Sequence, residues 1–233
     1  MSTTRVTRLT VKRRNRIDPF GDLHAVAARG MFTGNRGPLV DDDRRLVRHH
    51  ASNLWITCVT EFRGWRHPLD EPHRWTPLFF LDDAVALAAG HRPCSFCRRA
   101  DYVAYKDGVD EGLGGLDRPW ASTLNRRLAT ERLRRGRGID RAAHRRTWTA
   151  DAESLPDGTV VLDPSGSRVL LGHRSLAFGF DGWHDAQQRP SGAVEVLTPP
   201  TSVLALSNGF TPVLHASALA TGRPGRAFTR RSR

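Results

Sequence analysis

The chain has 233 residues, a mass of 26.0 kDa and a formal net charge of +12 at pH 7. This length supports one core of ordinary size or two small ones, and no apolar run approaches the roughly 20 residues that span a membrane. Three cysteines are too few for a disulfide-stabilised secreted scaffold. The basic N-terminus is not followed by an apolar segment of the kind found in signal peptides, so we expect a cytoplasmic protein with no membrane partner.

The positive charge comes almost entirely from arginine. Of the 36 basic residues two are lysines, Lys12 and Lys106, which leaves 34 arginines. A guanidinium group suits phosphate because it donates two parallel hydrogen bonds, so the composition favours DNA or RNA as a partner. An arginine bias is also typical of GC-rich genomes, and a merely solvated basic surface is about as well supported.

The N-terminal third of the chain predicts one strand among loops. Residues 1–17 carry five Arg, one Lys and no acid, which is typical of a basic arm. The stretch GMFTGNRGPL, from Gly30 to Leu39, has three glycines and a proline and predicts turns rather than a helix or a strand. The stretch NLWITCVTEF, from Asn53 to Phe62, predicts a strand with Cys58 in its middle.

Two helices are predicted around the other two cysteines. LFFLDDAVALAAG predicts a short strand joined to a short helix, which Asp82 or Asp83 can cap and Gly90 can end. CSFCRRADYVAYKDG predicts a second helix from near Cys94 to near Gly108. Its expected buried contacts are Phe96, Tyr102, Val103 and Tyr105.

The second half of the chain changes from helix to strand. Residues 120–146 predict a basic amphipathic helix, with nine arginines between Arg126 and Arg146 against two acids. From Leu155 onward, short β-branched runs separated by Gly and Pro predict hairpins. The stretch 192–218 predicts a strand, a short helix and another strand.

Together these elements predict an α+β protein: a small zinc-finger-like α/β module, a basic helical connector and a small β-rich C-terminal unit. The predicted divisions are a basic arm (1–25), the metal-binding module with its preceding loops (26–110), the Arg-rich connector (111–150), the β-rich unit (151–220) and a basic tail (221–233).

The stretch GHRPCSFC indicates a metal site. Cys94 and Cys97 form a Cys-x-x-Cys pair, a common half-site for zinc when the first cysteine lies in a turn before a helix. Cys58, on the predicted strand 36 residues earlier, is the natural third ligand. A structural zinc site needs four ligands, and His67 or His73 in the intervening loop is the candidate fourth.

Catalytic readings of the same cysteines are weaker. A thiol at a helix N-terminus beside arginines can act as a nucleophile, yet no His–Asp or His–Asn set accompanies this one. A thioredoxin-like redox motif would lie in a βαβ unit, and none is predicted here. The histidines and acids of HPLDEPH match no nuclease motif, so the residues favour a protein that is not an enzyme.

The string FFLDDAVALAAGHRPCSFCRRAD resembles the second half of the zinc-binding module of Ada-type DNA repair proteins. The resemblance covers residues 78–99, and more loosely 55–99. It implies that Cys94 and Cys97 match the family's C-terminal ligand pair and that Cys58 matches a ligand on the preceding strand. In that family a Cys-x-x-x-Cys supplies the first two ligands, and one of these accepts a methyl group from a DNA phosphotriester. Here Phe62 stands at the second of those positions, which puts methyl transfer in doubt.

The whole chain also resembles a set of bacterial proteins that share MFTGNRG, GHRPC..CRR and a VLTPP...HASA-like tail, and for which no function is established. The resemblance implies that a cysteine and a histidine of those proteins are replaced here by Pro38 and Val40, and with them a metal ligand.

The leading expectation is therefore a Zn2+-binding protein that contacts nucleic acid through Arg-rich surfaces. The arginines predicted to make these contacts are Arg98, Arg99, Arg126, Arg127, Arg134 and Arg135. One alternative is a DNA-processing or alkyl-accepting enzyme that uses a metal-bound thiolate. A second alternative is a protein-interaction scaffold in which the charge is incidental.

Overall fold

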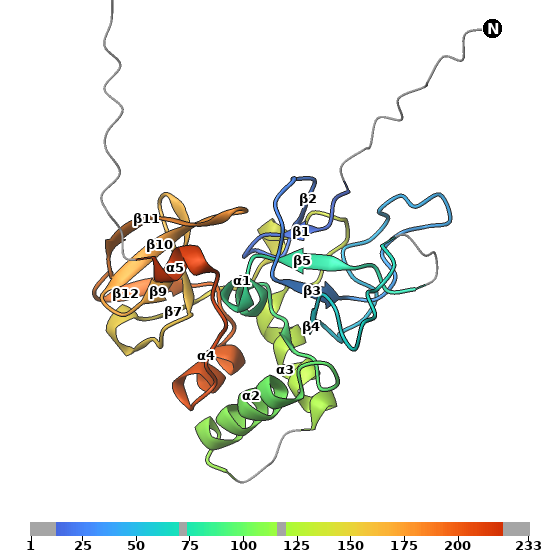
Figure 1. Cartoon of the computed structure of the whole chain (residues 1–233). Helices are drawn as coiled ribbons and strands as arrows, with labels where there is room; N and C mark the ends of the chain where they lie inside the picture. Colours follow the sequence, from blue (N-terminus) through green and yellow to red (C-terminus); the bar gives the residue numbers. More distant parts are fainter. Residues whose placement is uncertain (1–12, 70–73, 116–119, 221–233) are drawn as a thin grey trace, which may run out of the picture.

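The computed structural model describes residues 13–69, 74–115 and 120–220 (Figure 1). This part of the chain forms two six-stranded sheets and five α-helices, which confirms the predicted α+β class. The first 12 residues of the basic arm, the candidate ligand His73 and the basic tail (221–233) lie outside the described residues. Within the described residues, no helix is long and apolar enough to cross a membrane.

The N-terminal sheet is built from short strands that are far apart in sequence. Its order is β2-β1-β5-β3-β4-β6. The strands are β1 (Arg16–Ile17), β2 (Leu23–His24), β3 (Phe32–Asn35), β4 (Ile56–Val59), β5 (Leu78–Phe80) and β6 (Arg92–Pro93). Strand β3 is antiparallel to both β5 and β4, whereas β6 runs parallel to β4.

Strand β3 corrects the prediction of turns across residues 30–39. Its glycine, Gly34, pairs with Thr57 on one side and with Leu78 on the other. A Cβ atom at Gly34 would lie 2.3 Å from a ring carbon of Phe80. The glycine therefore accommodates a close packing contact within a sheet rather than a turn, a distinction that composition does not reveal.

Helix α1 (Asp83–Ala88) follows β5 as the sequence predicted. The Asp82 carboxylate accepts a hydrogen bond of 3.1 Å from the Val85 amide, which makes Asp82 the N-cap. The chain leaves the helix at Gly90, whose φ of +84° is a left-handed conformation that glycine adopts without strain. Every residue of α1 is buried, which accounts for its lack of a polar face.

The C-terminal sheet is a series of antiparallel pairs with the order β11-β10-β9-β8-β12-β7. Its strands are β7 (Trp148–Asp151), β8 (Val160–Asp163), β9 (Gly166–Leu171), β10 (Arg174–Gly179), β11 (Gly182–Gln188) and β12 (Ala193–Val196). Short turns join β8 to β9, β9 to β10 and β10 to β11, which confirms the predicted hairpins.

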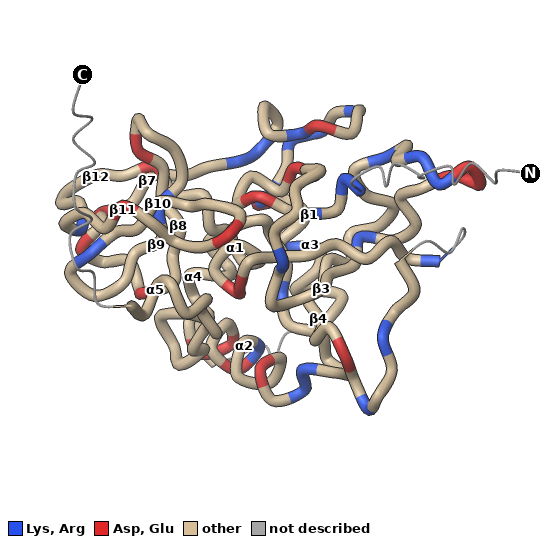
Figure 2. The backbone as a smooth tube through the Cα atoms, turned by 45° about the horizontal axis from the view of Figure 1, so that its top comes forward, with Lys and Arg blue, Asp and Glu red and all other residues tan. Residues whose placement is uncertain are grey.

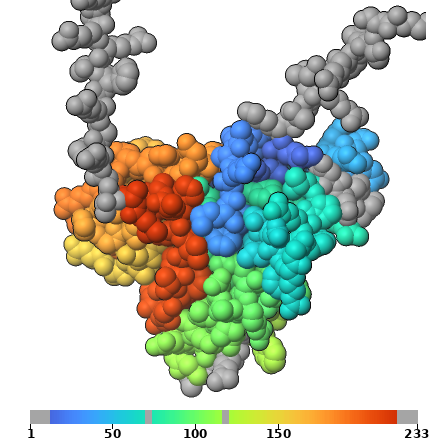
Figure 3. Space-filling model, in the orientation of Figure 1, coloured from blue at the N-terminus to red at the C-terminus, as the bar shows by residue number. Residues whose placement is uncertain are grey.

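One hydrophobic core joins the two sheets. Helix α1 lies between them (Figure 1), and its alanines pack in one cluster with Leu78 and Phe80 of β5 and with Val169 and Trp183 of the C-terminal sheet. Figure 3 shows the C-terminal segment, drawn in red, between the orange and yellow surface of the C-terminal sheet and the blue and green surface of the N-terminal residues. Strand β5 and helix α1 therefore share buried contacts with the C-terminal sheet.

Three further helices lie below α1 in the view of Figure 1: α2 (Arg99–Gly112), α3 (Ala121–Arg132) and α4 (Pro200–Ser207). Helix α2 begins five residues after Cys94, and Phe96 is 71% exposed instead of buried, because residues 94–98 form a turn. The buried contacts predicted for Tyr102 and Tyr105 are confirmed.

The predicted basic helix ends earlier than expected, at Arg132. Leu133 is extended and bridges to Arg145, so residues 133–147 fold back along the molecule, with a 3-10 turn at Ala142–His144. Glycines at 136 and 138 disfavour continuation of the helix. Near the C-terminus a short helix, α5 (Ala216–Leu219), replaces the last predicted strand.

Candidate metal centre

Two adjacent strands bring Cys58 and Cys94 together. Cys58 lies within β4, and Cys94 directly follows β6, which runs parallel to β4. The Cys94 amide donates a hydrogen bond of 2.8 Å to the Thr57 carbonyl, which fixes the register of the two cysteines. A separation of 36 residues in sequence is thus closed by one sheet pairing.

A tight turn returns Cys97 to the same point. The Phe96 amide donates to Cys94 Sγ at 3.4 Å, and the Arg98 amide donates to the Cys94 carbonyl at 3.2 Å. Helix α2 begins at the next residue, Arg99. A cysteine in a turn followed by a second at the start of a helix is the arrangement in which a Cys-x-x-Cys pair reaches one ion.

The three sulfurs form a compact cluster. The Sγ atoms of Cys58, Cys94 and Cys97 all lie within 4.8 Å of one another, and the thiols are free of disulfide bonds. Zn–S bonds of about 2.3 Å at tetrahedral angles would separate bound sulfurs by about 3.8 Å. The cluster is therefore compatible with a metal site that needs little movement of the side chains.

The cluster favours one negative charge on Cys94. Hydrogen bonds from the thiols of Cys58 and Cys97, together with the Phe96 amide, hold the pKa of Cys94 well below its usual range despite burial. The shared hydrogen bonds raise the pKa of Cys58 above its usual range, and burial adds to the rise. A thiolate flanked by two thiols is a soft, negatively charged donor set of the kind that zinc prefers.

Arg98 anchors the turn to the core. Its guanidinium donates to both carboxylate oxygens of Asp83, at 2.6 and 2.8 Å, and to Thr57 Oγ1 at 3.0 Å. Asp101, one turn into α2, accepts a further hydrogen bond of 2.8 Å. Because Thr57 precedes Cys58 and Arg98 follows Cys97, one side chain holds both cysteine-bearing segments in place.

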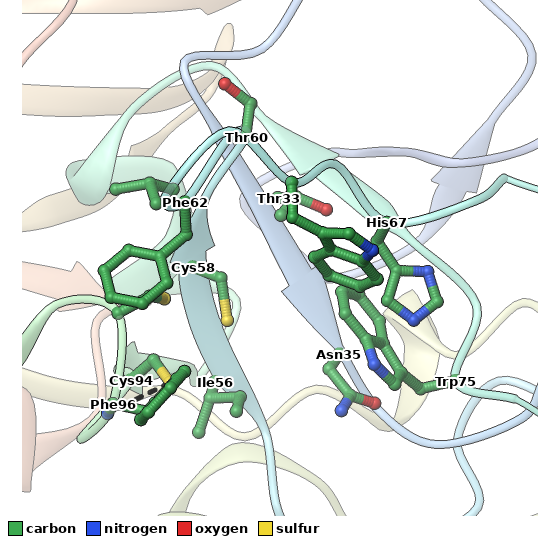
Figure 4. A pocket seen from close by; sticks show the side chains of 13 residues that line it. Thr33, Asn35, Ile56, Cys58, Thr60, Phe62, His67, Trp75, Cys94 and Phe96 are labelled. Carbon is green, nitrogen blue, oxygen red and sulfur yellow. Dashed lines mark hydrogen bonds between the residues drawn. The ribbon is translucent and has the colours of Figure 1, made fainter.

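An aromatic pocket opens beside the sulfurs. It has a cavity volume of about 270 Å3, and all three cysteines line it. Figure 4 shows Cys58 between Phe62 and Phe96 on one side and His67 and Trp75 on the other. The Phe62 and Phe96 rings lie 5.2 Å apart between centroids. The aromatic walls were not predicted from the sequence. Phe96, an aromatic residue between the two cysteines of the Cys-x-x-Cys pair, was the one signal that could have suggested them.

His67 lies in this pocket but not in the sulfur cluster. Its ring packs on Trp75 with 3.7 Å between centroids, and its Nδ1 atom is 2.8 Å from the Pro68 carbonyl. Donation from Nδ1 leaves Nε2 with a free lone pair. The other candidate fourth ligand, His73, is outside the described residues.

The arginines predicted to contact nucleic acid lie in several places. Arg98 is 4% exposed and engaged with Asp83, so it serves the interior, which corrects the prediction for this residue. Arg99 is exposed at the start of α2, and Arg126 is exposed on α3. Arg127 is half-buried, with Nε 3.3 Å from Thr201 Oγ1. Arg134 and Arg135 are exposed after α3 and line a separate pocket. Figure 2 shows basic and acidic residues interspersed along the chain.

Comparisons of the chain with models of protein families, with curated protein sequences and with solved structures gave no match. The likeness to the Ada-type module stays a prediction from the residues quoted above. The site is thus defined by its own geometry: three clustered thiols, a buried arginine that fixes them, and an aromatic pocket at the sulfurs.

Proposed function

We propose that Cys58, Cys94 and Cys97 bind one Zn2+ and that the chain contacts nucleic acid through exposed arginines. The observation that carries the proposal is the convergence of three sulfurs within 4.8 Å from two distant segments. Free cysteines that serve only as small apolar residues have no reason to converge. The turn geometry and the amide donated to Cys94 Sγ support the same conclusion.

The ion would supply a cross-link between β4 and the turn before α2. Its fourth position would face the aromatic pocket, where His67 Nε2, water or a bound molecule can complete the tetrahedron. Three thiolates and Zn2+ carry one net negative charge, and buried Arg92 and Arg98 lie near enough to offset it. The likeness to the Ada-type module is consistent with this ligand set.

The zinc proposal is tested by the metal content of reduced, tag-free protein. About one zinc per chain is expected in the wild type and a large loss in Cys94→Ser, because two thiolates hold zinc poorly. Ser95→Ala in the same turn is the matched control and should keep the metal. No zinc in the wild type after reconstitution, or full retention in Cys94→Ser, would contradict the proposal.

The variant His67→Gln tests whether His67 occupies the fourth coordination position of the proposed zinc ion. Zinc affinity measured by competition with a chelator should fall at least about tenfold if His67 is a ligand. An unchanged affinity would leave the fourth position open to water or a bound molecule. Both outcomes are compatible with the three-cysteine site and separate a structural ion from one with a free position.

Nucleic-acid contact is supported by exposed arginines, among them Arg99, which lines one surface pocket together with the exposed ring of Trp120. A pocket that offers both a basic side chain and an exposed aromatic ring suits single-stranded nucleic acid. The test is binding of the full chain to labelled single-stranded and duplex DNA over a range of salt. Affinity that falls steeply with salt supports backbone contact. Absence of binding at low salt would favour the interaction-scaffold alternative.

A second candidate function is alkyl transfer to a metal-bound thiolate, which the pocket at the sulfurs favours. The apolar cavity would admit a small alkyl group to Cys58 Sγ, where a new C–S bond forms as the phosphate oxygen leaves with the bonding electrons. Mass spectrometry of the chain after incubation with alkylated DNA tests this reaction. A gain of one methyl group on Cys58 supports it, and an unmodified chain excludes it for that substrate.

A further inference from the structure

A second pocket lies at the end of α3, where the chain turns back on itself. It has a cavity volume of about 340 Å3. Among the described residues, its polar side chains come from four arginines, one histidine and one asparagine, and no acidic residue lines it. The residues that matter for the argument are His50, Asn53, Arg132, Arg134, Arg135 and Arg141.

Two of these arginines are buried, so the pocket has a fixed floor. Arg132 is 2% exposed, and its guanidinium lies 3.6 Å from the Trp55 ring centroid while donating to the Gly90 and Asn53 carbonyls. Arg141 is 3% exposed and donates through one terminal nitrogen to the Arg134 carbonyl at 2.8 Å. Neutral carbonyl partners position these cations but leave their charge uncompensated.

More positive charge lies directly behind the floor. Arg36 is fully buried and its guanidinium lies 3.9 Å from the same Trp55 ring, and Arg145 is 6% exposed and donates to the Arg132 carbonyl. These cations repel one another. Burial lowers the pKa of Arg132 most, and the charges of Arg36 and Arg145 lower it further. The charges of Asp18 and Asp22 partly offset this repulsion, since both raise the pKa of Arg36 and Asp18 raises that of Arg145. Burying guanidinium ions without a directly paired carboxylate is still costly unless an anion completes the site.

The carboxylates nearest this cluster are already engaged. Asp22 accepts the backbone amides of Arg141 and Ala142 at 2.7 and 3.1 Å. Asp18 pairs with His24 at 2.7 Å. The lining histidine, His50, adds no charge of either sign. Burial together with Arg132 lowers its pKa to about 4, so its ring is neutral.

Several buried donors of the cluster are unpartnered. The Nε atom of Arg141 and one terminal nitrogen of Arg36 are shielded from solvent and make no hydrogen bond with any of the residues that the structure describes. Arg141 itself lines the pocket. Nearly all buried donors in folded proteins have a partner, so an orphaned guanidinium nitrogen at the wall of an open basic cavity points to a ligand that accepts hydrogen bonds.

We propose that this pocket binds a phosphate group. Arg132 and Arg141 form its rigid floor, and Arg134 and Arg135 close over the ligand from the exposed rim. Guanidinium groups match the geometry of phosphate oxygens, and partial burial strengthens each charge-assisted hydrogen bond. The inference is independent of the zinc site, and it rests on the proposed nucleic-acid contact only for the source of the phosphate.

The test uses the full chain and inorganic phosphate, with sodium chloride at matched ionic strength as the reference. Phosphate should raise the Tm above the chloride reference and give a saturable heat in calorimetry. Arg134→Gln and Arg135→Gln replace exposed side chains that the fold does not need, and each should weaken phosphate binding about tenfold. Arg29→Gln, at an exposed position between β2 and β3 and outside the pocket, is the matched control and should bind phosphate as the wild type does.

Two oligonucleotides of one sequence, with and without a 5′-phosphate, identify the source. Tighter binding of the phosphorylated strand, lost in Arg135→Gln, assigns the pocket to a nucleic-acid terminus. Equal binding of the two strands, with a response to inorganic phosphate, assigns it to a free phosphate compound. Absence of any oligonucleotide binding defeats the nucleic-acid proposal but not this one. No response to inorganic phosphate, or an equal loss of phosphate binding in Arg29→Gln, would overturn the inference.

Discussion

Arg98 and Asp83 form a bidentate pair, with hydrogen bonds of 2.6 and 2.8 Å, and the side chains are 1% and 2% exposed. The pair connects the turn of Cys97 to the first residue of α1. Asp83 also accepts the Val213 amide at 3.0 Å, so the same carboxylate holds the C-terminal segment. The candidate metal centre is therefore attached to the shared core through one buried ion pair.

Removing the charge of Asp83 should destabilise the whole chain. Asp83→Asn leaves Arg98 buried without its bidentate partner, and loss of one member of a buried pair costs about 3–5 kcal/mol. The free energy of unfolding in urea measures the loss. Glu61→Gln, which breaks the exposed Arg66–Glu61 pair of 2.6 Å, is the control and should change stability by less than about 1 kcal/mol. Equal effects of the two substitutions would show that the buried pair carries no special weight.

Gly34→Ala should disturb the centre of the N-terminal sheet. The new methyl group would meet the Phe80 ring at 2.3 Å, and relief requires a shift of a fully buried side chain. Overpacking of this kind costs about 1–3 kcal/mol. A double-mutant cycle with Phe80→Leu measures the cause, because the alanine should cost less once the ring is gone. An unchanged cost in the Phe80→Leu background would place the strain elsewhere.

The sequence predicted correctly the elements whose structure depends on neighbouring residues in the chain. The strand and capped helix across residues 78–90 and the hairpins after Leu155 follow from short-range propensity and turn chemistry, and the structure confirms them. The convergence of Cys58 on the Cys-x-x-Cys turn was predicted because a metal site needs further ligands, Cys58 is the third cysteine of the chain, and the Ada-type module carries a ligand on the preceding strand. A motif that needs all its members at one point carries long-range information that propensity lacks.

The errors concern partners that are distant in sequence. Gly34 signals a turn by composition, yet it serves a contact with Phe80, 46 positions later in the chain. Arg132 and Arg145 lie in the stretch predicted as a basic amphipathic helix, yet carbonyl groups of other segments hold them in the interior. Burial of arginine depends on acceptors brought together by the fold, which no local window of the sequence contains.

Metal removal should loosen the N-terminal half of the chain. Zinc that binds only the folded state raises the free energy of unfolding by mass action. The increase is about 2.7 kcal/mol when the free zinc concentration is 100 times the Kd for zinc. A chelator should therefore lower the Tm of the wild type and leave that of Cys94→Ser unchanged. Hydrogen exchange of the β4 and turn amides checks where the protection is lost. A Tm insensitive to both chelator and added zinc would argue against a bound ion.

Buried histidines make stability depend on pH. Burial, reinforced by Arg36, lowers the pKa of His49 to about 2, and the same two causes hold the pKa of His91 well below its usual range. Unfolding returns both rings to an ordinary pKa near 6.5, so the unfolded chain binds more protons in mildly acidic solution. The stabilisation is therefore complete above pH 6.5 and is lost as the pH falls below it.

The free energy of unfolding should fall by at least about 1.4 kcal/mol per pH unit between pH 6 and 5, the effect of one extra proton taken up on unfolding. His24 works in the opposite direction, because its hydrogen bond to Asp18 raises its pKa, and this offsets part of the slope from the two buried rings. Urea titrations at several pH values measure the slope. His49→Gln should reduce it by about one proton, and His173→Gln, at an exposed position, should leave it unchanged. A stability that rises as the pH is lowered through this range would mean that the buried rings are protonated in the folded protein, which the uncompensated arginines around them oppose.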